Sequence, residues 1–273
     1  DDLYNFIQSG DNSTEETKWA TTLSHTTNAN VSVNSLGTLT NNKITALNAL
    51  IADVEGTGSV TATVTDNNGD NILGGAVSLT TADSNDNITV NVGTVDPDGT
   101  NLTELRKLAN QAGVSRINGT VTISAADIQT MIDNAGAWAN LTTSNNYIDW
   151  TLDNTVTALQ AATLADKTNS SGSITWHSIT DQMSNLVTGT GTDTAISSNL
   201  SKAVTKDSAV PIVVNDTPLS TSNHVYGLNK IRAAQTSKLS NTLTATLTTN
   251  ASAAALLSGI TDQPISITIS DQV

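Results

Sequence analysis

The stretch ITALNALIADVEGTGSVTATVTD, residues 44–66, changes its hydrophobic period halfway along. In its first half, apolar side chains recur every three or four residues, at Leu47, Leu50, Ile51 and Val54. That spacing is typical of the buried face of a helix. In its second half, Val and Ala alternate with Ser and Thr, as in a strand that buries one face. The stretch therefore predicts a short helix followed by a strand.

The same order returns along the chain. Three further segments begin with an apolar helical stripe and end in an alternating Thr-rich run: residues 102–124, 156–181 and 225–250. Weaker copies lie between these segments. The expected strand centres fall near residues 32, 62, 90, 122, 149, 176, 212, 246 and 267, which gives a period of about 30 residues, the scale of repeat proteins.

A helix between two strands is a crossover connection, which makes the strands parallel. The sequence therefore predicts an α/β fold in which repetitive helix–strand units form an elongated, mostly parallel sheet, an α/β solenoid. We expect an N-terminal half-repeat at residues 1–43, followed by repeats at 44–98, 99–153, 154–223 and 224–273. Because Thr is accommodated on either face of a short strand, a β-sandwich-like fold with short helices is the alternative.

Repeats of the ITALNAL…GSVTATVTD type, rich in Thr, Asn and Ala, cover most of residues 36–273. They resemble the tandem repeats of large secreted surface-layer or adhesin-like proteins of marine cyanobacteria and related bacteria, and of some virion proteins of their phages. The resemblance implies a structural or adhesive role outside the cell. Leucine-rich repeats have a similar period, but their L-x-x-L-x-L-x-x-N pattern is missing here.

The composition argues against several classes of partner. The formal net charge is −14 with only 11 Lys and Arg, too few to neutralise a nucleic acid backbone or an anionic bilayer. Cysteine is absent, which excludes disulfides, thiolate zinc sites and cysteine nucleophiles. The longest apolar run, at residues 253–260, is far short of the roughly 20 residues that span a bilayer. We expect neither nucleic acid binding nor membrane insertion.

Acidic turns between residues 66 and 98 are the best candidates for chemistry. Their side chains are Asp66, Asn68, Asp70, Asp83, Asp86, Asp96 and Asp98. Closely spaced oxygen ligands in a turn are what Ca²⁺ binds, so one interpretation is a calcium site. However, Asn71 and Val77 stand where an EF-hand loop starting at Asp66 needs Gly and Glu. The other interpretation is that these residues form turns and helix caps.

Histidines and tryptophans are the remaining candidates. The histidines, His25, His177 and His224, lie in different repeats with no nucleophile elbow, His-x-x-x-His pair or phosphate loop nearby. We therefore expect no enzyme activity.

The tryptophans are Trp19, Trp138, Trp150 and Trp176. Trp150 shares a strand face with Ile148 and Leu152, which indicates core packing, and stacking on sugar rings is the alternative for the set.

These observations predict a non-catalytic structural protein, extracellular or at the cell surface, in a surface layer or filament, or else on a virion exterior. Its partners would be copies of itself, joined head-to-tail through residues 1–35 and 260–273, because the last strand would otherwise have an open edge. The alternative is a glycan-binding adhesin or phage fibre segment that binds a surface polysaccharide. An enzyme acting on polysaccharide is a third alternative.

Overall fold

A computed structural model describes residues 29–33, 41–54, 58–66, 72, 79, 83–95, 99–142, 144–216, 219–235, 243–258, 263 and 265–269. These residues divide into two compact units. Unit 1 comprises the described residues of Asp1–Ile123, Asp133–Trp150 and Lys167–Ser173. Unit 2 comprises those of Ser124–Ile132, Thr151–Asp166 and Ile174–Val273.

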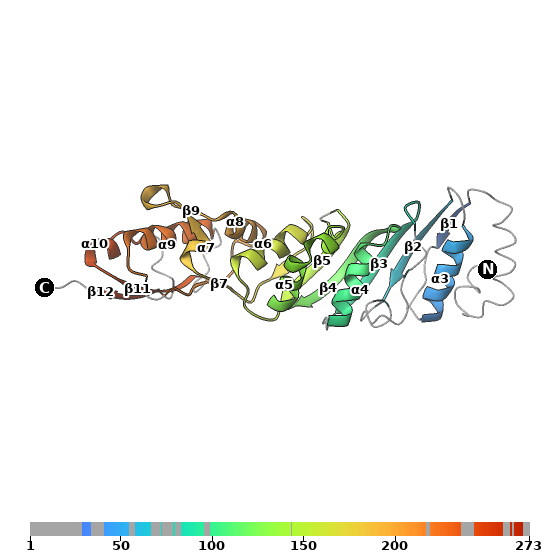
Figure 1. The fold of residues 1–273 in the computed structure, drawn as a ribbon, viewed down its shortest axis with the longest axis horizontal. Helices are drawn as coiled ribbons and strands as arrows, with labels where there is room; N and C mark the ends of the chain where they lie inside the picture. The colour runs from blue at the N-terminus through green and yellow to red at the C-terminus, as the bar shows by residue number, and fades with distance from the viewer. Residues whose placement is uncertain are drawn as a thin grey trace. The chain divides into compact units, whose positions relative to one another are not determined.

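Unit 1 is built on a parallel sheet whose strands follow one another in chain order (Figure 1). The strands are β1 (Asn30–Val33), β2 (Ser59–Thr65), β3 (Asn87–Val95), β4 (Val114–Ile123) and β5 (Asn146–Leu152). The full sheet order is β1-β2-β3-β4-β5-β6, with β6 at Ile174–Thr175. Unit 1 contains the helices α3 (Asn41–Asp53) and α4 (Gly99–Ala109) and the 3-10 helix η1 (Ala135–Trp138). Two further helices follow β4 and β5, namely α5 (Ala125–Asp133) and α6 (Ala158–Lys167), and all but the last residue of each belongs to unit 2, as does β6.

The core of unit 1 follows the two periodicities of the sequence. On β2, Val60, Ala62 and Val64 are buried, whereas Thr61 and Thr63 between them are exposed. The same alternation buries Ile88 and Val90 on β3, Ile117 and Val121 on β4, and Ile148 and Trp150 on β5. Helices contribute Leu47, Leu50 and Leu105 to this core. Each fully buried aliphatic side chain stabilises the fold by about 1.5–3 kcal/mol relative to an exposed one.

Two glycines let β3 and β4 pair closely. The register of the pair shifts between Asn91 and Thr94, at a bulge where Gly93 has φ 66°. Glycine adopts a positive φ without steric cost, and glycines with a positive φ are typical of β-bulges. On the facing strand, a Cβ at Gly119 would lie 2.5 Å from Cγ2 of Val92. A side chain at position 119 would therefore force the two strands apart.

Unit 2 has a second parallel sheet, in the order β12-β11-β10-β7. Its strands are β7 (Ile179–Asp181), β10 (Ile212–Val214), β11 (Leu243–Thr249) and β12 (Ile265–Ile269). The helices are α7 (Met183–Leu186), α8 (Ser198–Lys206), α9 (Ser222–Ala234) and α10 (Ala251–Ala254), and Figure 1 shows α9 and α10 on one side of β11 and β12. A short antiparallel hairpin, β8 (Val187–Thr188) and β9 (Ala195–Ile196), follows α7, and the 3-10 helix η2 (Gly191–Asp193) lies in its loop.

The predicted α/β class is confirmed for the described residues, which form parallel sheets with helices rather than a β-sandwich. All but one of the predicted strand centres lie inside a strand, and the exception, residue 176, directly follows β6. The prediction is wrong in detail between residues 181 and 212, where α8 and the hairpin were not expected. Strands of two residues are too short to show a period, so the sequence pattern does not reveal them. The predicted N-terminal half-repeat lies mostly outside the described residues.

Candidate functional site: the polar face of the sheet in unit 1

The sheet of unit 1 has one face that carries polar side chains. Strands in chain order, joined by right-handed crossovers, place their connecting helices on a single face. On the opposite face, Thr61 and Thr63 are exposed and Thr89 and Asn91 are half-buried. We call this surface, formed by Thr61, Thr63, Thr65, Thr89, Asn91, Arg116, Asn118, Tyr147 and Asp149, the polar face.

A row of amides crosses the polar face from strand to strand. Asn118 on β4 stands opposite Asn91 on β3, which stands opposite Thr65 on β2. The side-chain amide of Asn118 donates to Oδ1 of Asn91 at 2.6 Å. The amide of Asn91 in turn donates to Oγ1 of Thr65 at 3.1 Å. These bonds hold the two planar amide groups, on β3 and β4, in one orientation and join them to the hydroxyl of Thr65 on β2.

Arg116 lies at the end of this row. Its Nε–H donates to Oδ1 of Asn118 at 2.8 Å, and its guanidinium carbon lies 3.6 Å from the centroid of the Tyr147 ring. A guanidinium on an aromatic face is held by cation–π attraction of about 0.5–1 kcal/mol at an exposed site. Arg116 itself is exposed, while Tyr147 is half-buried beneath it. The cation is thus fixed in place on the surface of the sheet.

Asp149 is the acid nearest to this cluster along β5. Its Oδ1 accepts hydrogen bonds from both the backbone N–H and the hydroxyl of Ser173, each at 2.7 Å. No ion pair joins Asp149 to Arg116 within the described residues. The polar face therefore offers an oriented cation, amides and hydroxyls, which suit non-covalent recognition.

The acidic residues predicted as a calcium site fall partly outside the described residues. Asn68, Asp70, Asp96 and Asp98 are among those outside. Asp66 is buried and accepts from the backbone N–H of Ile72 at 2.9 Å. Asp86 accepts from the backbone N–H groups of Val60 and Asp83, at 2.8 and 2.9 Å. Asp83 accepts from the N–H of Asn85 at 2.7 Å.

The bonds of Asp83 and Asp86 to the backbone of residues 83 and 85 are local turn contacts, whereas the bond of Asp86 to Val60 reaches β2, 26 residues away. In the part of the chain that the structure describes, no three His, Cys, Asp or Glu side chains gather where they could hold a metal ion. The calcium interpretation stays a prediction for the region as a whole.

Three of the four tryptophans are buried. Trp138, Trp150 and Trp176 are between 0 and 9% exposed, and Trp19 lies outside the described residues. Buried rings cannot stack on a sugar, so the described tryptophans are core residues and the aromatic ring on the polar face is Tyr147. The sequence does carry a signal for it: in NYIDWTL, Tyr147 and Asp149 alternate with the buried Ile148 and Trp150.

Two of the three histidines, His177 and His224, lie in the described part of the chain. His177 is exposed, with only hydroxyls of Thr155 and Ser178 near its ring, at 3.4 Å. Nδ1 of His224 accepts from the backbone N–H groups of Ser220 and Thr221, which makes it part of the capping box of α9. His25 lies outside the described residues.

A hollow of about 400 Å³ lies beside α4 in unit 1. Its described lining combines the apolar Ile72, Leu79 and Leu108 with the Glu104–Lys107 ion pair, whose nitrogen and oxygen are 2.6 Å apart. Residues 73–78, outside the described part of the chain, connect two of the lining residues. We therefore assign no ligand to this hollow.

Comparisons with known proteins identify no relative of this chain. No protein-family model matches the chain, and neither does any curated protein or solved structure. None of the described helices is long and apolar enough to cross a bilayer.

Proposed function

We propose that this chain is a non-catalytic structural protein of an extracellular or particle surface, such as a surface layer, a filament or a virion exterior. In this proposal its helix–strand units are solenoid repeats, at 44–98, 99–153, 154–223 and 224–273, after a half-repeat at 1–43. Copies of the chain then assemble head-to-tail through their terminal units.

The observation that carries this proposal is a hydrogen bond that recurs in unit 2 about one repeat apart. In each of α5, α6 and α7, the backbone N–H of the first residue donates to the side-chain oxygen of an Asn or Asp. That Asn or Asp lies at the end of a later strand or within two residues after it. The pairs are Ala125 with Asn154 at 2.8 Å, Ala158 with Asp181 at 2.9 Å, and Met183 with Asp216 at 2.5 Å. Their sequence separations are 29, 23 and 33 residues.

These bonds make each helix start depend on a residue at or after the end of a later strand, and the bond from Ala125 to Asn154 joins the proposed repeats 99–153 and 154–223. The first N–H groups of a helix have no partner inside the helix, and a side-chain oxygen that accepts from them contributes about 1 kcal/mol. In solenoids, stability similarly comes from contacts between neighbouring repeats rather than from long-range contacts. A chain built in this way gains stability when another unit is added to its end.

The strands that end the described sheets supply the surfaces for such an addition. β1 is the outermost strand of its sheet and β12 the outermost strand of the other. Both are parallel to their single strand neighbour, so another parallel strand would continue either sheet in the same sense. Uncovered edges pair readily with other chains, and a head-to-tail contact that does not close produces a filament.

The test is electron microscopy of the full chain beside variants altered at each edge. One variant lacks residues 263–273, which removes β12. The second is Asn30→Pro: the N–H of Ser59 donates to the carbonyl of Ala29, and across a planar trans peptide the N–H of Asn30 therefore faces away from β2. Proline there removes an outward donor and leaves the pairing with β2 intact.

Asn30→Ala is the matched control, because it removes the side chain but keeps the backbone N–H. We expect filaments or sheets from the full chain and from Asn30→Ala, and dispersed particles from the other two variants. Far-UV circular dichroism must show that each variant is folded. Dispersed full-length chains, or equal assembly by the truncated chain, would contradict the proposal.

Glycan binding, as in an adhesin or phage fibre segment, is the second candidate function. It is favoured by the polar face, where oriented amides and hydroxyls surround an aromatic ring that carries a cation. Surfaces of this kind can form hydrogen bonds with sugar hydroxyls. An array of neutral and acidic glycans tests it, and binding that is lost on Tyr147→Ala would support it.

A further inference from the structure

We propose that the polar face binds a sugar carboxylate, as in a uronic acid residue of an otherwise neutral glycan, through the guanidinium of Arg116. This inference rests on the second candidate function, glycan binding, and is independent of self-assembly. It assigns the ligand class and the residue that recognises it.

The guanidinium of Arg116 is positioned before any ligand arrives. The Tyr147 ring lies under it, and the bond from Nε to Asn118 fixes its rotation. Asn118 is fixed in turn by Asn91. Both terminal nitrogens remain without a partner within the described residues, so the side chain presents a planar fork of donors. Such a fork matches the two oxygens of a carboxylate, and prior ordering lowers the entropic cost of binding.

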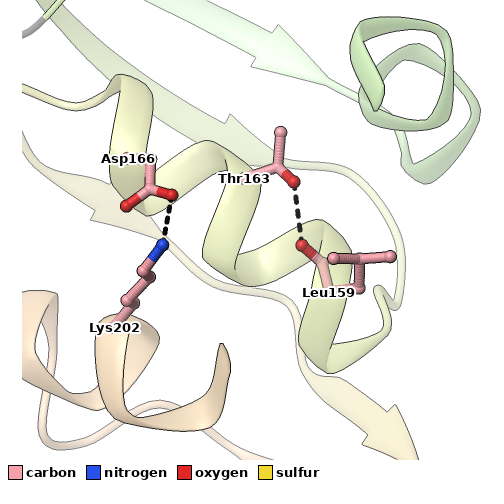
Figure 2. Close-up of polar contacts among 4 residues, drawn as sticks. All are labelled: Leu159, Thr163, Asp166 and Lys202. Atoms are coloured by element: carbon pink, nitrogen blue, oxygen red, sulfur yellow. Dashed lines mark hydrogen bonds and ion pairs between the residues drawn. The ribbon is translucent and has the colours of Figure 1, made fainter. Parts of the chain in front are cut away.

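The charge of Arg116 is also not neutralised by a nearby acid among the described residues, unlike that of two lysines. Nζ of Lys107 lies 2.6 Å from a carboxylate oxygen of Glu104. Nζ of Lys202 lies 2.5 Å from one of Asp166, as Figure 2 shows. Arg116 instead has a ring and a neutral amide as its partners in the described part of the chain. An anion can therefore bind to it without displacing an existing ion pair.

The neighbours of Arg116 favour a glycan over other carriers of a carboxylate. Across the strands, Arg116 stands opposite Thr89, and Thr89 stands opposite Thr63. This row is neutral and offers hydroxyls to a polar, hydroxyl-rich ligand. It has no apolar patch of the kind that forms the centre of a protein interface.

The net charge of the chain restricts the class of ligand further. A nucleic acid or densely charged polyanion would need several cations, and the chain carries a net charge of −14. A single carboxylate among neutral sugars uses the fork of Arg116 while limiting repulsion from the rest of the protein. We therefore assign a sparsely acidic glycan.

The test is a titration of the ¹⁵N-labelled full chain with a trisaccharide of one glucuronic acid residue and two neutral sugars, followed by NMR at the Nε–H of Arg116 and the side-chain amide of Asn118. In variants of Arg116, the amide of Asn118 alone reports binding. The methyl ester of the same trisaccharide removes the carboxylate charge and keeps the sugars. Arg116→Lys keeps the positive charge and removes the planar fork, and Arg116→Met removes both. Lys202→Met is the control, because it changes the net charge by the same amount as Arg116→Met at a residue that does not belong to the polar face. A capped peptide with one glutamate among serines presents a carboxylate without sugar.

We expect the acidic trisaccharide to shift both signals of the native chain, and its methyl ester to bind about tenfold more weakly. Arg116→Lys and Arg116→Met should each lose about tenfold in affinity, with unchanged melting temperatures, and Lys202→Met should bind like the native chain. The peptide should bind more weakly than the acidic trisaccharide.

Equal binding of the acid and the ester, or affinity unchanged in Arg116→Lys, would overturn this inference and leave glycan binding in place. Stronger binding of the peptide would point to a protein partner and overturn it as well. If neither trisaccharide binds and the glycan array is also negative, both the inference and the second candidate function are wrong.

Discussion

The carboxylate of Asp181, at the end of β7, accepts a hydrogen bond of 2.9 Å from the backbone N–H of Ala158, the first residue of α6. Its other oxygen accepts from the N–H of Gln182 and the side-chain amide of Asn185. Asp181 and Ala158 are both buried, so the N–H of Ala158 has no alternative partner in water, whereas Gln182 and Asn185 are exposed. One side chain therefore joins the start of one helix to the start of the next.

Replacing Asp181 should weaken unit 2 substantially. Asp181→Ala leaves the N–H of Ala158 buried without an acceptor, and we expect a loss of about 3 kcal/mol in the free energy of unfolding. Urea denaturation followed by circular dichroism measures it. Asp166→Ala is the control, because its pair with Lys202 is exposed and should be worth less than about 1 kcal/mol. Similar losses in the two variants would show that the bond to Ala158 contributes little.

Asp86 separates the two interpretations of the acidic turns. Its carboxylate accepts from the N–H of Val60 and of Asp83, so Asp86→Ala should cost about 2 kcal/mol whether or not calcium is present. Thermal melts in EDTA and in millimolar calcium check this. If the cost appears only in calcium, or if calcium raises the melting temperature of the native chain but not of the variant, Asp86 is a metal ligand.

The contact between β3 and β4 depends on Gly119. A Cβ there would lie 2.5 Å from Cγ2 of Val92 and 2.8 Å from the carbonyl oxygen of Gly93, so Gly119→Ala should cost about 1–3 kcal/mol. The exposed Gly136 is the matched control, since a Cβ added there would meet no described atom within 4 Å. Gly136→Ala should be neutral or stabilising by up to about 1 kcal/mol. Equal effects on the urea midpoint would contradict the steric argument.

Two apolar residues test the assignment of the core. Trp150 is fully buried, and Trp150→Ala should cost about 3–5 kcal/mol because it leaves a large cavity. Leu159 on α6 is 49% exposed, and Leu159→Ala should change stability by less than about 0.5 kcal/mol. Differential scanning calorimetry distinguishes the two. A tolerated Trp150→Ala would mean that the ring is not a core residue.

The sequence by itself determined the α/β class and the positions of most strands. Both follow from local periodicity: Val60, Ala62 and Val64 alternate with Ser and Thr, and Leu47, Leu50 and Ile51 mark a helix face. The capping box of Ser124 and Asp127 is equally local, because its partners are three residues apart. Such features depend only on neighbours in the chain and so can be read from it.

Only the tertiary structure decided which distant polar groups meet. Asp181 directly precedes Gln182, the N-cap residue of α7, yet its carboxylate caps α6, which begins 23 residues earlier, and the first N–H of α7 donates to Asp216 instead. Likewise, Arg116 and Tyr147 come from different strands, and their contact depends on the register of the sheet. Periodicity fixes the face on which a side chain lies, but the partner across the sheet is set by strand order and register, which emerge when the apolar faces pack together.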